Sequence, residues 1–255
     1  MWEVYDSLLS GMPTDEVVRS AQVAEVWTSV TADCGTGIAM TPQQKYQHTS
    51  FQGHIAGMNL AELARYSKSW NIFEATLGVA AFNAWYNHVD RLPNDPGLLI
   101  RNQRDGGGFR VFDDMVRGKK VTMIGHIPGF REFSDICDFS ILERVPMDGD
   151  YPDPACEYIL PEQDIVFITA TTLANKTMER LLTLTKNCFT VIWGPSTPLT
   201  DRLLDAGADA LMGTAVVAPE QLITLIGEGG HSRQFGTTVQ SVLWFRDPNM
   251  LNKLI

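Results

Sequence analysis

The chain has 255 residues, which suits one large domain or two modest ones with an ample core. Hydrophobic residues make up 44% and charged residues 20%, the balance of an ordinary soluble globular protein. The formal charge is −10 and no Lys/Arg cluster appears, so we expect no nucleic-acid partner.

The N-terminal residues and the cysteines indicate a compartment. Residues 1–6 are acidic and lack the features of a signal peptide, and no apolar run approaches the ~18 residues of a spanning helix. The cysteines Cys34, Cys137, Cys156 and Cys188 are scattered without a CxxC pair, which disfavours a zinc ribbon. We therefore expect a cytoplasmic protein with reduced thiols and no membrane partner.

The first part of the chain mixes helices with a hairpin. In chain order, the patterns predict helices over 3–10 and 14–21, hairpin strands over 24–32 and 38–41, a loop over 42–58, and helices over 60–64 and 72–87. Asn71 followed by Glu74 matches a capping-box arrangement at the start of the longest helix. Small residues along that helix indicate close packing. Prolines and glycines in 91–108 predict a long loop or linker, which places a domain boundary near residue 110.

The second part alternates strands with helices. The patterns predict strands over 121–125, 138–143, 164–169, 188–193, 209–213 and 239–246, and helices over 129–136, 175–187, 198–206 and 219–227. The strands are continuous apolar runs, so both faces of their sheet should be covered. The fold class is therefore α/β, with an α+β domain over 1–110 and a doubly wound parallel sheet over 111–255.

The loop after the first of these strands reads Gly125-His126-Ile127-Pro128-Gly129. It lacks the GxGxxG fingerprint of a dinucleotide site, and the glycines are equally well explained as turn residues. His126 stands where a functional residue would, just past a strand end. Glu143 ends the next strand, 18 residues after Gly125; it could hold a nucleoside or polyol, or be a solvated carboxylate.

The loop around residues 169–177 is rich in hydroxyls. Thr171 and Thr172 follow the strand, and Asn175 is the expected N-cap of a helix. Lys176 then falls in the first helical turn, where the helix dipole disfavours a cation. That placement indicates a negative group nearby, such as a ligand.

The third loop contains Gly194, Ser196 and Thr197. Thr197 as N-cap with Pro198 at the first helical position is a structural explanation for this loop. The functional explanation is an oxyanion or phosphate held by hydroxyls and helix N–H groups. The three loops form the rim of one pocket if their strands lie side by side.

Two polar residues of the long helix over 72–87 also need an explanation. Asn83 lies among apolar residues, so its amide must anchor the domains together or contact a ligand. Glu74 lies nine positions earlier, on the opposite side of an ideal helix, so both reach one site only if the helix breaks. His48, His54 and His126 show no paired ligand spacing, and we predict no metal ligands among them.

Taken together and in this order, these motifs resemble the DUF364 family of heavy-metal chelation proteins with its DUF4213 N-terminal domain. The segments that carry the resemblance are 68–71, 74–84, Gly125-His126, 138–143, 149–152, 159–162, Lys176-Thr177 and 194–199. The resemblance implies an enolase-N-terminal-like domain followed by a Rossmann-like domain, with a ligand site in the cleft between them. It also implies metal chelation, or condensation and hydrolysis around pterin, flavin or siderophore-like molecules.

These observations favour a small-metabolite-binding protein, acting as an enzyme on an anionic or heterocyclic ligand linked to metal handling. His126, Lys176 and Glu74 are the candidate catalytic residues. The candidate ligand-binding residues are Asn83, Gly125, Glu143, Thr171, Thr172, Asn175, Gly194, Ser196 and Thr197. The alternatives are a non-catalytic metal-binding or metal-delivery protein and a methyltransferase-like protein that uses S-adenosylmethionine. The sequence names no cofactor, and a homo-oligomer and a bound metal ion or chelate stay open.

Overall fold

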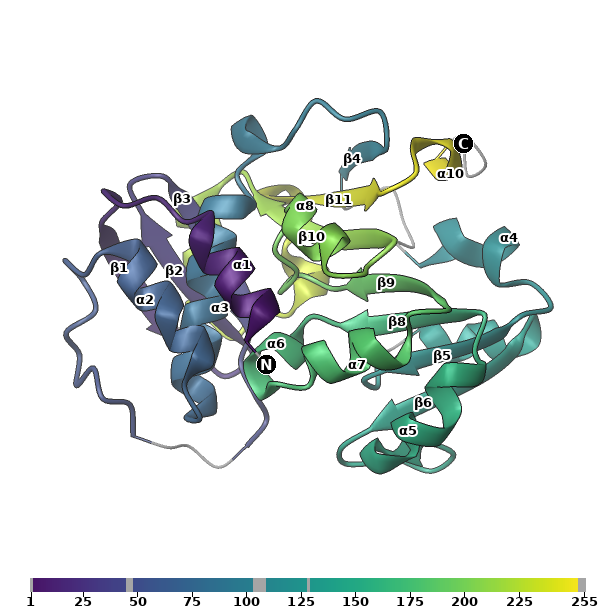
Figure 1. Ribbon diagram of the computed structural model, residues 1–255. Helices are drawn as coiled ribbons and strands as arrows, with labels where there is room; N and C mark the ends of the chain where they lie inside the picture. The colour runs from purple at the N-terminus through teal and green to yellow at the C-terminus, as the bar shows by residue number, and fades with distance from the viewer. Residues whose placement is uncertain (1, 45–47, 103–108, 128, 252–255) are drawn as a thin grey trace.

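Two sheets organise the protein, whose computed structural model describes residues 2–44, 48–102, 109–127 and 129–251 (Figure 1). One is three-stranded with order β1-β2-β3, and the other is eight-stranded with order β4-β11-β10-β9-β8-β5-β6-β7. The strands are β1 Val18–Val23, β2 Trp27–Ala32, β3 Gly35–Met40, β4 Leu98–Asn102, β5 Lys120–Ile124, β6 Asp138–Glu143, β7 Tyr151–Pro152, β8 Ile165–Thr169, β9 Phe189–Trp193, β10 Ala210–Val216 and β11 Val239–Phe245.

The helices connect and cover these sheets. The α-helices are α1 Glu3–Ser10, α2 Leu60–Arg65, α3 Ile72–Tyr86, α4 Asp113–Val116, α5 Cys156–Ile159, α6 Thr171–Asn175, α7 Met178–Leu184, α8 Asp201–Asp205, α9 Pro219–Gly227 and α10 Pro248–Leu251. The 3-10 helices are η1 Tyr66–Lys68, η2 Val89–Arg91, η4 Arg110–Phe112, η5 Phe130–Asp135, η6 Asp153–Ala155, η7 Leu160–Glu162, η8 Ser232–Gln234 and η9 Gly236–Thr238. No helix among the described residues combines the length and hydropathy needed to cross a bilayer.

The large sheet is mostly parallel, and the predicted α/β class is confirmed. Strands β7, β6, β5, β8, β9 and β10 run parallel, whereas β11 pairs antiparallel with β10, and β4 pairs antiparallel with β11. The expected loop over 91–108 therefore contains an edge strand, Leu98–Asn102, which belongs to the large sheet. The division into domains 1–110 and 111–255 stays a prediction.

Both faces of the large sheet are buried, as its continuous apolar strands predicted. Along β8, Val166 and Ile168 enter one hydrophobic core, while Ile165 and Phe167 enter the other. This alternation follows from the two-residue period of a strand. The second core is rich in edge-to-face aromatic contacts, such as that between Phe130 and Trp193 at 4.9 Å between ring centroids.

The helix predicted over 72–87 forms as α3, and its residues from Phe73 to Ala84 are all buried. Asn71 caps it by accepting hydrogen bonds from the N–H groups of Phe73 and Glu74. The small residues give the close packing that we expected: a Cβ added at Gly37 in β3 would overlap the α3 backbone at Ala84. Helix α3 also packs on α6, at the carboxyl edge of the large sheet (Figure 1).

The helix predicted over 14–21 is wrong, because Val18–Val23 is strand β1. The acids Asp15 and Glu16 suggested a first helical turn, but β1 pairs antiparallel with β2, from Val18 opposite Ala32 onward. Long-range pairing here overrides the local pattern.

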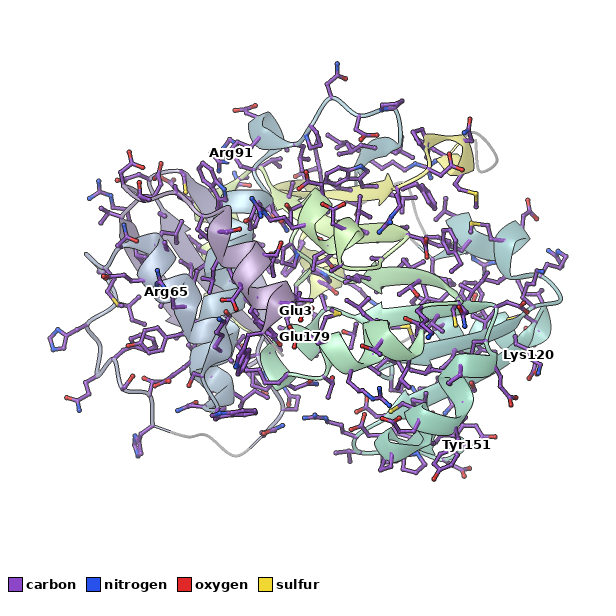
Figure 2. All side chains as sticks on the ribbon, in the orientation of Figure 1. Glu3, Arg65, Arg91, Lys120, Tyr151 and Glu179 are labelled. Carbon is purple, nitrogen blue, oxygen red and sulfur yellow. The ribbon has the colours of Figure 1, made fainter. Side chains whose placement is uncertain are left out.

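Helix α1, predicted over 3–10, is held at both ends by residues from the large-sheet half. Glu179 of α7 accepts a hydrogen bond from the backbone N–H of Val4 at 3.0 Å, and Figure 2 labels it near Glu3. At the other end, Arg202 of α8 donates to the carbonyl of Ser7 at 2.9 Å. The anion at the N-terminus and the cation at the C-terminus each match the helix dipole, worth ~0.3–1 kcal/mol apiece.

Candidate functional site

The three strand-end loops lie next to one another, because β9, β8 and β5 are neighbours in the sheet. Ile124 pairs with Ile168 and Thr169 pairs with Trp193, so the loops begin at nearly the same level. The chain leaves β5 toward β6 on one side, and β8 leads to β9 on the other. The carboxyl edge between β5 and β8 is therefore the topological switch point, where open α/β sheets bind ligands.

Glycines begin two of these loops and need a left-handed backbone there. Gly125 has φ +98° and Gly194 has φ +109°, values that L side chains rarely adopt. A Cβ at Gly125 would lie 3.0 Å from Cγ2 of Thr169, so these two loops touch. Apart from the glycine and its two chain neighbours, no described residue has an atom within 4 Å of the Cβ position at Gly194, so the space beside this turn is open.

The hydroxyls after β8 are partly used within their own loop. Thr172 is buried, and its hydroxyl donates to the carbonyl of Thr169 at 2.6 Å. This hydroxyl therefore stabilises the turn. Thr171 is half-buried, and its Oγ1 lies 3.1 Å from Oγ1 of Thr169. Thr171 thus retains the freer hydroxyl of the two candidates.

The predicted helix over 175–187 is interrupted at Lys176. Asn175 is the last residue of α6 rather than an N-cap, although its Oδ1 accepts a hydrogen bond from the N–H of Thr177 at 3.1 Å. Lys176 follows it at φ +71° and caps the C-terminus of α6, not the first turn of a helix. The helical pattern of the sequence continues through these residues. The backbone, however, is left-handed at Lys176, and a new helix, α7, begins at Met178.

Lys176 is half-buried and has an unusual environment for an ammonium group. Its Nζ donates to the carbonyl of Ala174 at 2.6 Å, and no ion pair joins it to an acid of the described residues. Burial lowers the pKa of Lys176 to about 8. A left-handed backbone at a non-glycine residue costs ~1–2 kcal/mol, a strain that clusters at functional sites.

The third loop is fixed by α3 rather than by a helix cap. Thr197 is not an N-cap, because α8 begins at Asp201 with Thr200 as its cap. Pro198 does not start the helix, because two residues, Leu199 and Thr200, separate it from Asp201. Ser196 is buried and its Oγ accepts a hydrogen bond from Met40 N at 2.9 Å, while the buried Oγ1 of Thr197 has no partner among the described residues.

Asn87, just past α3, holds this third loop in place. Its Nδ2 donates to the carbonyls of Thr197 at 2.9 Å and Thr214 at 3.0 Å, and its Oδ1 accepts from Leu199 N at 2.8 Å. Sequence reasoning gave Asn87 no role. Its only local signal is its spacing of four from Asn83, which places both amides on one helix face.

Helix α3 is continuous, and Glu74 and Asn83 contact different segments of the first part of the chain. Glu74 does not complete a capping box; its carboxylate accepts from Ser50 N and Ser69 Oγ, each at 2.6 Å. Burial raises the pKa of Glu74, but these hydrogen bonds outweigh burial and hold the pKa below its usual value. Asn83 donates to the carbonyl of Ile38 at 2.8 Å, and its buried Oδ1 has no described partner.

His126 and Glu143 come together at the end of β6. Oε2 of Glu143 accepts from the backbone N–H of His126 at 2.8 Å, and Oε1 accepts from Arg144 N at 2.6 Å. Nδ1 of His126 lies 2.8 Å from Oδ2 of Asp150, a carboxylate with no exposed surface. Arg131 donates to the other oxygen of Asp150, also at 2.8 Å.

Asp150 and Arg131 were therefore missed as parts of the candidate site. Asp150 stands in the Gly149-Asp150-Tyr151-Pro152 motif of the family resemblance, which is the only sequence signal for it. Its partner His126 lies 24 residues earlier, and no local spacing rule connects residues at that distance.

The described residues contain no group of three or more His, Cys, Asp or Glu side chains placed to hold a metal ion. His48 and His54 are exposed in the loop before α2. The four cysteines are free thiols, each apart from the others.

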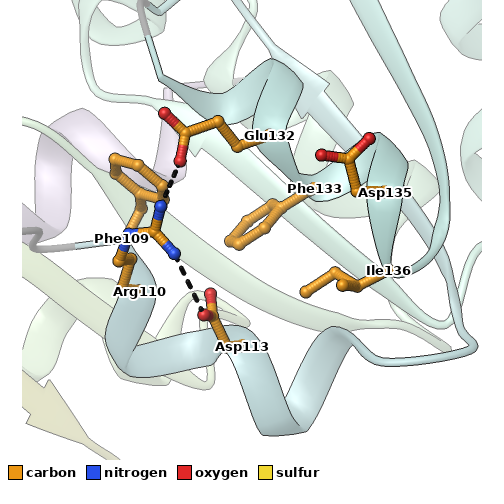
Figure 3. A pocket seen from close by; sticks show the side chains of 7 residues that line it. All are labelled: Phe109, Arg110, Asp113, Glu132, Phe133, Asp135 and Ile136. Carbon is orange, nitrogen blue, oxygen red and sulfur yellow. Dashed lines mark hydrogen bonds and ion pairs between the residues drawn. The ribbon is translucent and has the colours of Figure 1, made fainter.

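A pocket of about 250 Å³ has none of the predicted site residues in its lining (Figure 3). Its lining residues are Phe109, Arg110, Asp113, Glu132, Phe133, Asp135 and Ile136. Arg110 lines one side of it and forms ion pairs with Glu132 and Asp113. The guanidinium is thus already neutralised, and the pocket offers a ligand no free cation.

Two solved structures resemble this chain over nearly its full length. A DUF364-family protein of unknown function from Desulfitobacterium hafniense is 32% identical, with a TM-score of 0.87 over 96% of this chain and 99% of that one. A second, from Pyrococcus horikoshii, is 21% identical with a TM-score of 0.77 over 95% and 98%, and it supports the fold.

An uncharacterized protein of Methanocaldococcus jannaschii is 34% identical over 172 residues, 63% of this chain; the match spans 61% of that relative's length. Residues 5–86 match DUF4213, and residues 108–245 match DUF364; both families are described as "Putative heavy-metal chelation". The chain belongs to the DUF364 family.

Proposed function

We propose that the protein binds a small anionic or heterocyclic metabolite, of the pterin, flavin or siderophore kind, at the carboxyl edge of the large sheet. Gly125, Thr171 and Gly194 would line the site, and His126 would act on the ligand as acid or base. The switch point between β5 and β8 and the open space beside Gly194 support this location.

The observation that carries the proposal is the half-buried ammonium of Lys176. A cation removed from water without an acidic partner is unfavourable, and here its backbone is strained as well. Unfavourable arrangements of this kind cluster at ligand-binding sites, and the ligand that would offset the cost of burying an ammonium is an anion. A bound carboxylate or phosphate would restore the charge balance that no described acid provides.

The family description, heavy-metal chelation, bears on the kind of ligand that we propose. No preformed set of metal-binding side chains exists among the described residues, so metal would arrive bound to a chelating metabolite. Catecholates and pterins supply oxygen donors of their own. In this proposal, Ni²⁺ or Fe³⁺ binds tightly only when such a molecule is present.

A thermal-shift screen tests the proposal with folate, flavin mononucleotide, ATP and 2,3-dihydroxybenzoate as probes. We expect at least one probe to raise the melting temperature of the wild-type protein by ligand linkage. Lys176→Met should abolish this shift. Lys120→Met is the matched control, because Lys120 is an exposed lysine at the opposite end of β5 (Figure 2).

Two results would overturn the proposal. One is the absence of stabilisation by every probe, together with no small molecule retained by protein purified under native conditions. The other is a probe that stabilises wild type and Lys176→Met equally, since the anion would then bind elsewhere.

A further inference from the structure

Asp150 is a buried carboxylate that receives three donors. Oδ2 accepts from His126 Nδ1 at 2.8 Å and from Met147 N at 3.0 Å, and Oδ1 accepts from Arg131 Nη2 at 2.8 Å. Burial raises the pKa of Asp150, but these hydrogen bonds and the charge of Arg131 outweigh burial and lower it. The carboxylate is therefore ionised at neutral pH.

An ionised carboxylate can only accept hydrogen bonds, so Nδ1 of His126 must carry the proton. In the neutral ring this leaves the lone pair on Nε2, which has no partner among the described residues. The side chain of His126 is 17% exposed, so the ring is accessible while its inner nitrogen is fixed. The arrangement matches the role of the aspartate in an Asp–His pair, which sets tautomer and orientation.

A second carboxylate fixes the backbone of the same residue. Glu143 accepts from the N–H of His126 at 2.8 Å, so both the ring and the main chain of this loop residue are held. A histidine with only a structural role in the loop would need just one of these two contacts. Asp150 and Glu143 together hold His126 in one orientation and leave its Nε2 without a partner among the described residues. This arrangement pre-organises the ring for proton transfer.

We propose that Asp150 is a positioning residue that makes Nε2 of His126 the atom exchanging a proton with the ligand. The ligand group would be a weakly acidic hydroxyl, such as a phenol, catechol or enol. Its O–H bond breaks, the proton bonds to Nε2, and Asp150 stabilises the resulting imidazolium through Nδ1. The ligand oxygen is left as an anion, the form that chelates metal ions. The ligand's identity rests on the function proposed above.

The tautomer can be tested without any ligand, by long-range ¹H–¹⁵N NMR of the histidine rings. We expect neutral His126 to be protonated at Nδ1. His88 provides an internal contrast, because Asp90 N donates to its Nδ1 at 3.3 Å and so requires the opposite tautomer. A His126→Gln variant assigns the signal. Neutral His126 protonated at Nε2 would overturn the inference.

Proton transfer can be tested with 4-nitrocatechol, whose visible spectrum reports ionisation. Bound to the wild-type protein, the probe should be ionised at a pH where the free probe is neutral. Asp150→Asn keeps the shape of the side chain but loses its charge, and should lower the ratio of ionised to neutral bound probe by about tenfold or more. Asp90→Asn, which changes the exposed acid beside His88, should leave the ratio unchanged.

The outcomes separate this inference from the proposed function. If Asp150→Asn binds the probe but leaves its ionisation as in wild type, the positioning role is wrong and the binding site stands. If no probe binds wild type, the proposed function fails, and the NMR experiment alone decides the role of Asp150. Should Asp150→Asn fold poorly, Arg131→Gln offers a milder change: it removes the cation that partly neutralises Asp150, so it should raise the same ratio, and an unchanged ratio would overturn the positioning role.

Discussion

Oδ1 of Asn87 accepts a hydrogen bond from the backbone N–H of Leu199 at 2.8 Å, and this contact joins helix α3 to the loop after β9. The same amide donates to two carbonyls, at Thr197 and Thr214. One buried side chain thus fixes the third loop of the candidate site relative to the first part of the chain.

Asn87→Ala should strongly destabilise the protein. The change leaves one N–H and two carbonyls buried without partners, at ~1–3 kcal/mol each, so we expect a loss of about 3 kcal/mol or more. Urea unfolding followed by circular dichroism measures it. Asn83→Ala is the comparison, because it leaves only the carbonyl of Ile38 without a partner and should cost less. Equal losses would contradict the proposed anchoring by Asn87.

Lys176→Gly should make the protein more stable than Lys176→Ala. Both changes remove the half-buried ammonium, and they differ only in the cost of φ +71°. Glycine adopts that backbone freely, which predicts a difference of about 1 kcal/mol, or roughly 2–4 °C in melting temperature for a chain of this size. Calorimetry of the two variants gives the answer, and an equal or lower melting temperature for glycine would mean that the turn is not strained.

Lys176 also predicts a change in stability under alkaline conditions. Its pKa is about 8 in the folded protein, below the ~10.4 of an exposed lysine, so the unfolded chain binds more protons between these values. The contribution of Lys176 to the free energy of unfolding therefore rises with pH across that window. Burial raises the pKa of the Cys34 and Cys137 thiols to about 11, which acts in the opposite direction. The test is therefore the amount by which the unfolding free energy of Lys176→Met exceeds that of wild type. This amount should grow smaller from pH 8 to pH 10, because only wild type carries the Lys176 ammonium.

Acid should remove a contribution to stability from two carboxylates. The pKa values of Asp150 and Glu74 lie below their usual values, so each carboxylate stabilises the folded protein above ~pH 4. That contribution is lost as pH falls through the folded pKa. Asp150→Asn and Glu74→Gln should each flatten the decline in unfolding free energy below pH 4, measured by urea titration at several pH values. If the unfolding free energy of either variant declines below pH 4 as steeply as that of wild type, the corresponding carboxylate is not stabilised by its hydrogen-bond donors.

The sequence predicted the parts of the fold that depend on local pattern. The run Ile165 to Ile168 is apolar without alternation, and it forms a strand buried on both faces. Asn71 caps α3 as its spacing indicated. The turns at Gly125 and Gly194 also lie where the strand ends were expected, because glycine after an apolar run is a direct signal of a change in backbone direction.

The parts that the sequence did not predict depend on distant partners. Strand β4 forms because Leu98 pairs with Trp244, far along the chain. Lys176 stands in a helical pattern that gives no sign of the left-handed turn. The contact between His126 and Asp150 joins two loops, and only the fold brings those loops together.

The placement of α1 and β4 has a consequence for how the chain can be divided. The segment before Phe109 contributes twice to the other half: α1 is held by Glu179 and Arg202, and β4 completes an edge of the large sheet. A chain severed between Asn102 and Phe109 would therefore yield two pieces that recognise each other at separate points, and neither piece would present a finished surface alone.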